Sequence, residues 1–102
     1  MSSPLKGIKI LDLTHMLAGP YGTMVLADLG AEIIKIEPPL KGEITRNLLK
    51  NDPDYSVDGV GAYHLTLGRN KKSLTLDLKS DPGKHIFYQL VKMKLYLQLM
   101  EL

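Results

Sequence analysis

The chain has 102 residues, of which 44% are hydrophobic and 24% are charged, and its formal net charge is +2. These values are typical of a soluble globular domain and argue against a disordered chain, a collagen or a coiled coil. The small net charge argues against a nucleic-acid partner. A chain of this length buries about two thirds of the surface that it exposes when unfolded, which suffices for one small core.

Cysteine is absent, which excludes disulfides and thiolate metal sites, and the three histidines lack the spacing of a metal site. We therefore expect no bound metal. The opening sequence MSSPLKG has no hydrophobic signal core, and no apolar run approaches the ~18 residues of a membrane span. The expected location is the cytoplasm, without a membrane partner.

The first part of the chain has the pattern of a strand, a helix and a second strand. Residues 8–13 are nearly continuously apolar, which predicts a strand buried on both faces. A helix is expected over residues 20–29, with Pro20 in its first turn and Gly30 as a left-handed cap. Residues 31–37 predict a second buried strand, which two prolines end. The expected fold class is therefore α/β, with the two strands parallel.

Residues 40–61 form a long stretch without periodicity, rich in Gly, Asn, Asp and Pro. A loop of this length inside a compact domain is often functional. Residues 62–67 are then predicted to form an apolar strand.

The basic residues 68–72 predict a turn, and the strict alternation over residues 73–78 predicts a half-buried strand. Ser80, followed by Asp81 and Pro82, predicts the start of a helix. Its expected apolar face consists of Ile86, Phe87, Leu90 and Val91.

The turn after the first strand is a candidate ligand site, because backbone N–H groups at a helix N-terminus suit an anion or a nucleotide. Gly19 and Gly22 do not form the dinucleotide fingerprint, and Glu37 only imitates the ribose-binding acid of a Rossmann domain. A nicotinamide cofactor is therefore not expected. Asp12 and Asp77 each end a strand, so we favour a capping or loop-ordering role over catalysis. His15 is the histidine of functional interest, whereas His64 and His85 are expected to be structural.

Five blocks in matching order and spacing resemble the family III CoA-transferases, the CaiB/BaiF-type group that includes formyl-CoA transferases and α-methylacyl-CoA racemases. The blocks are LKGIKILDLT (5–14), AGP (18–20), LADLGAE with KIEPP (26–39), TR (45–46), and RNKKS with LDLK (69–79). The resemblance covers residues 4–92. It implies the N-terminal βαβ portion of a Rossmann-like parallel-sheet domain, truncated, in residues 1–92, followed by a divergent tail in residues 93–102.

The resemblance implies transfer of coenzyme A (CoA) from an acyl-CoA donor to a small carboxylic acid through an aspartyl-CoA intermediate. CoA is then a substrate, and no permanently bound cofactor is implied. In relatives the nucleophilic aspartate lies beyond the point where this chain stops, so no catalytic residue is assigned and the chain alone is expected to be inactive. The alternatives are an acyl-CoA racemase of the same family and a non-catalytic fragment. Full-length relatives form interlocked homodimers.

The resemblance also implies where CoA is held, namely the turn at Leu17 and Ala18 and the segment 76–79. Basic side chains nearby would bind the CoA phosphates, and Lys79 is preferred over the turn lysines. The complete set of expected CoA-binding residues is Leu17, Ala18, Arg46, Lys72, Leu76, Asp77, Leu78 and Lys79.

Two departures from the family pattern have consequences. Leu17 and Pro38 stand where formyl-CoA:oxalate enzymes have glutamine and arginine, which argues against oxalate as the substrate. Residues 93–102 do not match the family, and their leucines fit either a strand or one side of a helix. We interpret this tail as the product of a frameshift or a truncated reading frame. The buried strands expected over residues 8–13 and 31–37 need neighbours from the rest of the family domain, so we expect the chain alone to expose apolar surface and to self-associate.

Overall fold

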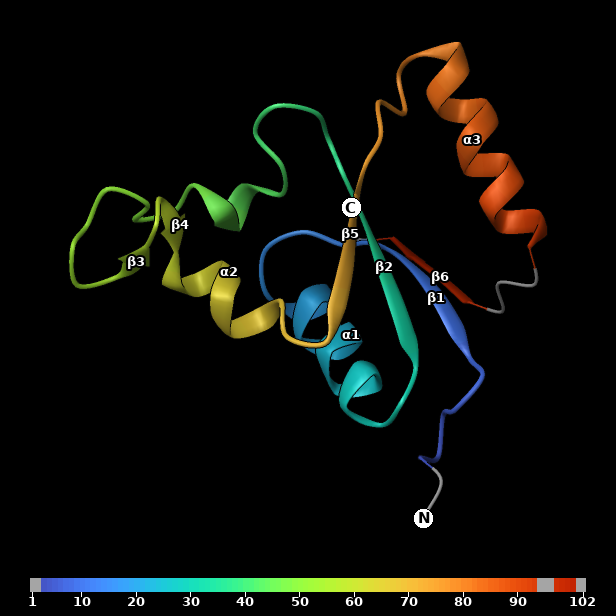
Figure 1. Cartoon of the computed structure of the whole chain (residues 1–102), viewed down its shortest axis with the longest axis horizontal. Coiled ribbons are helices and arrows are strands. Elements are labelled where there is room, and N and C mark those ends of the chain that lie inside the picture. The colour runs from blue at the N-terminus through green and yellow to red at the C-terminus, as the bar shows by residue number, and fades with distance from the viewer. Residues whose placement is uncertain (1–2, 94–96, 101–102) are drawn as a thin grey trace.

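The structure is a computed structural model that describes residues 3–93 and the backbone of residues 97–100. It consists of a parallel sheet with a helix on each face, and a small hairpin and a short helix lie beside the sheet (Figure 1). The strand order is β5-β2-β1-β6, and each neighbouring pair is parallel. These strands are β1 (Lys9–Leu13), β2 (Glu32–Glu37), β5 (Lys71–Thr75) and β6 (Leu97–Met100).

The remaining elements lie between these strands in the sequence. They are α1 (Ala18–Asp28), the 3₁₀ helix η1 (Ile44–Arg46), the hairpin of β3 (Ser56–Val57) and β4 (Val60–Gly61), α2 (Ala62–Leu67) and α3 (Asp81–Lys92). None of the helices in residues 3–93 is long and apolar enough to cross a membrane. In the same residues, no cluster of three or more His, Cys, Asp or Glu side chains could hold a metal ion.

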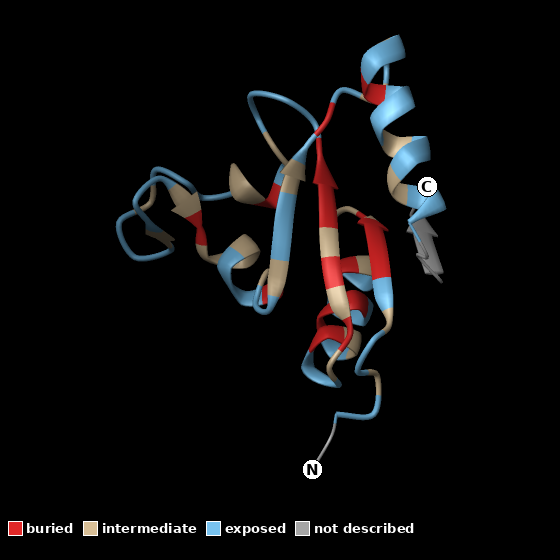
Figure 2. Ribbon diagram, turned by 45° about the vertical axis from the view of Figure 1, so that its right-hand side comes forward, coloured by how far each residue is buried: buried red, intermediate tan, exposed pale blue. Residues whose placement is uncertain are grey.

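The core lies on both faces of the two central strands, which Figure 2 shows as the most buried part of the molecule. Between α1 and the sheet, the buried cluster consists of Ile10, Ala27, Ala31 and Ile33. Between α3 and the sheet, Phe87 and Leu90 pack against Leu11, Ile36 and Leu76. Because the neighbours Ile10 and Leu11 belong to opposite clusters, the prediction of a first strand buried on both faces is confirmed.

The predicted βαβ unit is confirmed with small shifts of its bounds. β1 pairs with β2 in parallel, and β2 ends at Glu37, directly before the two prolines. Helix α1 begins two residues earlier than predicted, so Pro20 is its third residue and still lies in the first turn, where no intrahelical N–H partner is needed. Gly30 has a φ of +105°, as expected of a left-handed helix end.

Residues 62–67 form the helix α2, so the prediction of a strand there was wrong. A six-residue apolar run does not distinguish a strand from a buried helix turn, and the contacts of the helix decide it. Gly61 directly precedes the helix and packs closely against the backbone of Leu48. An added Cβ at Gly61 would lie 1.9 Å from the Leu48 carbonyl oxygen. His64 then contacts Thr45 of η1, with Nδ1 3.1 Å from Oγ1.

The strand predicted over residues 73–78 instead spans Lys71–Thr75. The prediction was right for residues 73–75 and wrong for residues 76–78, which follow the strand. Asn70 adopts a left-handed φ of +62° and completes the turn, which lets the strand begin at Lys71. Pairing with β2 runs from Ile33 opposite Lys71 to Glu37 opposite Thr75, and ends with a hydrogen bond from Leu76 N to the Glu37 carbonyl oxygen. Of the residues predicted as a basic turn, Lys71 and Lys72 therefore belong to the sheet, and residues 69–70 form the turn.

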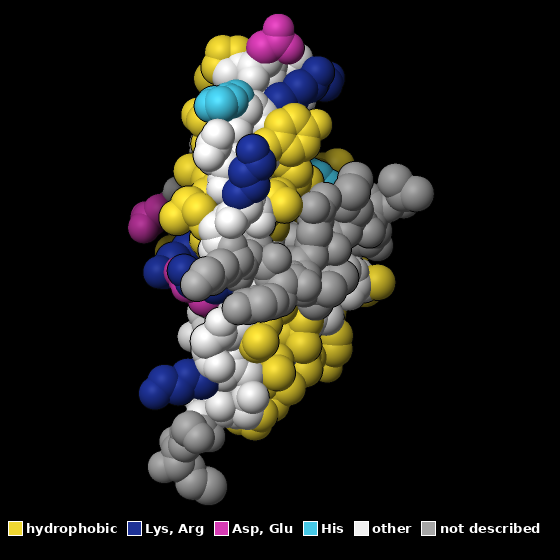
Figure 3. Space-filling view, turned by 90° about the vertical axis from the view of Figure 1, so that its right-hand side faces the viewer, with side chains coloured by type: hydrophobic (Ala, Val, Ile, Leu, Met, Phe, Trp, Pro, Cys, Tyr) yellow, Lys and Arg dark blue, Asp and Glu magenta, His cyan; other side chains and the backbone are white. Residues whose placement is uncertain are grey.

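Helix α3 begins as predicted, because the Ser80 hydroxyl accepts a hydrogen bond of 3.0 Å from Gly83 N. Its apolar face is narrower than predicted. Ile86 and Val91 are 46% and 39% exposed, and they lie on the outer surface, where Figure 3 shows hydrophobic side chains beside charged ones.

The tail of the chain adds an edge strand to the sheet. β6 pairs in parallel with β1, from Ile10 opposite Leu97 to Leu13 opposite Met100. The strand interpretation of the leucine pattern therefore holds for residues 97–100. The other leucines of that pattern, Leu95 and Leu102, lie outside the described residues.

Candidate functional site

A cleft of about 370 Å³ lies where β1, β2 and β5 end. The apolar part of its lining consists of Leu13, Ile36, Leu76 and Leu78, which all belong to the cluster beneath α3. The rest of its lining consists of His15, Glu37, Pro38, Pro39, Asp77 and Lys79. Ligands of open parallel sheets generally bind outside the carboxyl ends of the strands, so this cleft is the candidate site.

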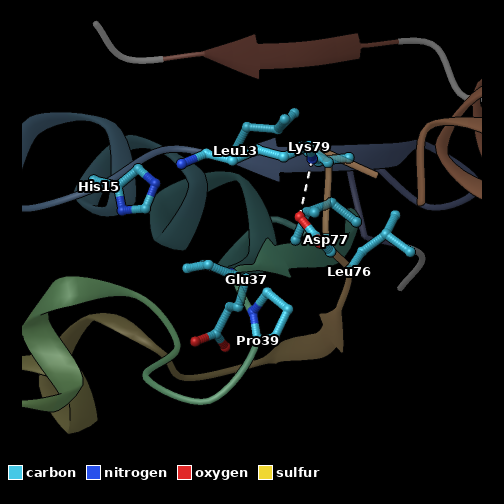
Figure 4. A pocket seen from close by; sticks show the side chains of 10 residues that line it. Leu13, His15, Glu37, Pro39, Leu76, Asp77 and Lys79 are labelled. Atoms are coloured by element: carbon cyan, nitrogen blue, oxygen red, sulfur yellow. Dashed lines mark hydrogen bonds between the residues drawn. The ribbon is translucent and has the colours of Figure 1, made fainter. Parts of the chain in front are cut away.

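The segment after β5 forms one side of the cleft (Figure 4). Lys79 N donates to Asp77 Oδ1 at 3.0 Å, and the Ser80 hydroxyl donates to the Asp77 carbonyl oxygen at 2.9 Å. Asp77 therefore orders the turn into α3, as expected from its place in the sequence. The Lys79 side chain is exposed, and no carboxylate of residues 3–93 forms an ion pair with it.

His15 lies on the other side of the cleft (Figure 4). The buried carboxylate of Glu43 lies near it. Nδ1 of His15 is 3.8 Å from Oε1 of Glu43, and the same oxygen accepts a hydrogen bond of 2.8 Å from Met16 N. The second oxygen of Glu43 accepts hydrogen bonds from the backbone N–H and the hydroxyl of Thr45. Burial by itself raises the pKa of Glu43, but these hydrogen bonds and the charge of Lys35 lower it overall.

Glu37 is a second buried carboxylate beside the cleft, with 2% of its surface exposed. Arg46 binds it with both Nε and Nη2, at 2.6 and 2.7 Å, and Ser73 and the backbone N–H of Glu43 add hydrogen bonds of 2.6 and 2.7 Å. Burial raises the pKa of Glu37, but these donors and the Arg46 charge lower it to about 2. Protein donors thus occupy both oxygens, which argues against a ribose contact at this residue.

Asp12 is the third buried carboxylate and lies beneath α1. It accepts hydrogen bonds from Thr14 N at 2.9 Å and from the Thr23 hydroxyl at 2.7 Å, and Lys71 Nζ lies 3.2 Å away. Lys35 donates to the Thr14 carbonyl oxygen at 3.1 Å and adds its charge. Burial raises the pKa of Asp12, but the hydrogen bonds from Thr14 and Thr23 and the Lys35 charge lower it overall. The loop-ordering role expected for Asp12 is confirmed.

The structure brings half of the expected CoA-binding residues into the cleft, namely Leu76, Asp77, Leu78 and Lys79. Leu17 and Ala18 do not line it. Both are exposed at the start of α1, and they directly follow Met16, which is anchored to Glu43 behind the cleft.

The two remaining cations of the expected set are engaged elsewhere. Arg46 is bound to Glu37, and 33% of its side chain is exposed. Lys72 lies near the opposite end of β5 from the cleft and forms an exposed ion pair of 2.9 Å with Glu32. Of the expected basic residues, only Lys79 lines the cleft.

Glu43 and Lys35 are the residues near the site that the sequence interpretation missed. Both had a readable pattern. Lys35 lies two residues after Ile33 and two before Glu37 in β2, so it shares their face of the strand, which α1 covers. Glu43 precedes Thr45 by two residues, which is the spacing of a side chain that caps a short helix.

A second hollow of about 470 Å³ adjoins the cleft, and the two share His15, Pro38 and Pro39. Its other lining residues are Met16, Lys41, Gly42, Ile44 and Asn47. The combined lining is mostly hydrophobic and includes two lysines, Lys41 and Lys79. An extended ligand with an apolar middle and an anionic group suits this arrangement.

Comparison with known proteins identifies the family. The family model described as CoA-transferase family III matches residues 5–93. Formyl-CoA:oxalate CoA-transferase of Bradyrhizobium sp. (strain ORS 278) is 44% identical over 92 residues, which are 90% of this chain and 21% of that protein. Succinyl-CoA:glutarate CoA-transferase of Homo sapiens is 47% identical over 87 residues, or 85% of this chain and 19% of that protein. The chain thus spans about a fifth of the length of these curated relatives.

Solved structures agree with this match. A hypothetical protein of Mycobacterium tuberculosis superimposes with a TM-score of 0.82 at 35% identity, over 97% of this chain and 25% of that one. A CAIB/BAIF family protein of Brucella suis superimposes with a TM-score of 0.78 at 36% identity, over 89% of this chain and 24% of that one. The chain belongs to CoA-transferase family III.

Proposed function

We propose that this chain provides part of the CoA site of an enzyme that transfers CoA from an acyl-CoA donor to a carboxylic acid. The observation that carries the proposal is the position of residues 76–79. The family resemblance assigns this segment to CoA, and it lines a cleft at the carboxyl ends of parallel strands. The apolar lining suits the pantetheine arm or the adenine, and the exposed Lys79 suits a phosphate.

The covalent step of this reaction requires a carboxylate that can attack a thioester carbonyl. Asp12 is fully buried and bound by Thr14 and Thr23, and Asp77 holds the turn at Lys79. Both carboxylates are therefore engaged in structural contacts. The proposed nucleophile is an aspartate outside the residues of this chain, and oxalate is not the proposed acceptor because Leu17 and Pro38 replace the residues of the oxalate enzymes.

The test of CoA binding is calorimetric titration of CoA into the wild-type chain and into Lys79→Ala. A charge-assisted contact with a phosphate contributes about 1.5 to 3 kcal/mol, so the affinity should fall roughly ten- to a hundredfold. The matched control is Lys84→Ala, which removes an exposed lysine of α3 that lines neither hollow. Because Lys79 is exposed, added salt should weaken wild-type binding. Equal affinities of the wild type and Lys79→Ala would refute the assignment of CoA to this segment.

The reaction itself is tested by a CoA-transfer assay with acyl-CoA and small carboxylic acids. The chain alone should show no turnover, whereas a longer protein that contains it and also carries the nucleophilic aspartate should be active. Turnover by the chain alone that survives Asp12→Ala and Asp77→Ala would contradict the proposal. A longer protein that carries the aspartate and binds CoA but shows no turnover would also contradict the proposal.

A further inference from the structure

Glu43 lies behind the cleft rather than in it. It lines neither hollow, and only 1% of its surface is exposed. Each of its oxygens nevertheless accepts a backbone hydrogen bond, from Met16 N at 2.8 Å and from Thr45 N at 2.9 Å. Its own backbone N–H donates to Glu37 at the end of β2. Glu43 therefore connects three segments that meet at the cleft.

The bond to Met16 holds an unfavourable backbone conformation. Met16 has a φ of +70°, which is uncommon for a residue with a side chain and persists only where the surroundings fix it. The next residue, Leu17, caps α1 without a side-chain hydrogen bond. The position of the helix start, and of His15 before it, therefore depends on the hydrogen bond between Met16 and Glu43.

We infer that Glu43 is a positioning residue for the CoA site. By holding Met16 N, it fixes the turn that places His15 between the two hollows and Leu17 at the start of α1. Glu43 itself does not touch the ligand. The inference rests on the proposed function, because the ligand whose site is positioned is CoA.

A carboxylate is required for this role because both of its oxygens face backbone donors. In Glu43→Gln the side-chain amide has a single acceptor oxygen, and its NH₂ group must then face one of the two N–H groups. Thr45 presents two donors, its N–H and its hydroxyl, whereas Met16 presents one. The amide oxygen should therefore turn to Thr45, and Met16 N–H loses its partner.

The experiment compares Glu43→Gln with Thr45→Val in the 102-residue chain. Thr45→Val removes a hydroxyl bond to the other oxygen of the same carboxylate, and Thr45 lines neither hollow. CoA affinity is measured by calorimetry, stability by thermal unfolding, and exposure of the Met16 amide by hydrogen exchange with NMR detection. A purely structural role of Glu43 would affect both variants alike.

We expect Glu43→Gln to weaken CoA binding at least tenfold and to speed Met16 amide exchange at least tenfold. Thr45→Val should lower the melting temperature to a similar extent but keep CoA affinity within threefold of the wild type. Wild-type affinity in Glu43→Gln, or equal loss of affinity in both variants, would overturn the inference and leave the proposed function intact. Failure of the wild-type chain to bind CoA would overturn both.

Discussion

The two sides of the cleft use charge in opposite ways. On the side of β1 and β2, the carboxylates Glu37 and Glu43 are buried, and protein donors bind all of their oxygens. On the side that follows β5, Lys79 is exposed and has no ion-pair partner in residues 3–93. The charges of the first side are bound by donors of the protein, whereas the second side offers a charge to a ligand.

This difference separates structural cations from available ones. Arg46 and Lys71 carry the same charge as Lys79, yet both bind buried carboxylates of the first side or of the layer beneath α1. Removal of a cation that is paired with a buried carboxylate lowers stability strongly, and such a cation contributes little to ligand binding. Removal of an unpaired exposed cation should hardly change stability, but that cation can bind a ligand. Substitutions of single basic residues therefore test the comparison directly.

The largest effect is expected for Arg46→Met. It removes the bidentate partner of Glu37 and leaves a carboxylate that is 2% exposed without its counter-charge. Removal of one member of a buried pair typically costs about 3 to 5 kcal/mol, and the free energy of unfolding should fall by about this amount in urea titrations.

The matched control is Arg69→Met, which removes the same side chain from an exposed pair. Arg69 binds Asp28 at 2.6 Å, but 56% of its side chain is exposed. Its loss should leave the free energy of unfolding close to that of the wild type. Similar losses in the two arginine variants would show that burial of the carboxylate does not decide how much such an ion pair contributes to stability.

The sequence predicted the central layers of this fold well, because they depend on local patterns. The apolar strands, the proline stop after Glu37 and the Ser80 cap are short-range features, and each was confirmed. The helix at residues 62–67 could not be predicted because its contact with η1 joins residues 19 positions apart. A six-residue run carries too little periodicity to replace that contact.

The candidate site was predictable only in part for the same reason. Residues 76–79 were identified because family blocks and a strand end coincide there. The sequence favoured Lys79 over the turn lysines, but it could not reveal that Arg46 and Lys71 bind buried carboxylates. The ion pairs Lys71–Asp12 and Arg46–Glu37 join different elements of the fold, and no local pattern reveals them.

A smaller loss of stability is expected at low pH, because Glu37 on the first side of the cleft becomes protonated there. Glu37 has its pKa lowered from 4.5 to about 2 in the folded chain. The unfolded state therefore binds a proton at a higher pH than the folded state does. The stability that Glu37 contributes is fully present above pH 4.5 and is lost as the pH falls toward 2, by roughly 2 to 3 kcal/mol.

Urea unfolding between pH 2 and 7 measures this loss, and Glu37→Gln is the control because its side chain does not titrate. The wild type should lose more stability than Glu37→Gln over the window from 4.5 down to 2, since the other acidic residues are common to both proteins. Parallel pH profiles of the two proteins would contradict the lowered pKa of Glu37.

The smallest effect is expected for Lys72→Ala. Lys72 lies in β5 next to Lys71, but its side chain is exposed, whereas that of Lys71 binds the buried Asp12. The Lys72 ammonium pairs with Glu32 at 2.9 Å, and 72% of its side chain is exposed. Exposed pairs contribute about 0 to 1 kcal/mol, so the free energy of unfolding should change by no more than this amount, which is well below the loss expected for Arg46→Met. CoA affinity should change less than twofold, because Lys72 lies near the far end of the strand from the cleft. A loss of CoA affinity as large as that of Lys79→Ala would mean that CoA also contacts the amino end of β5, and that the cleft alone does not define the site.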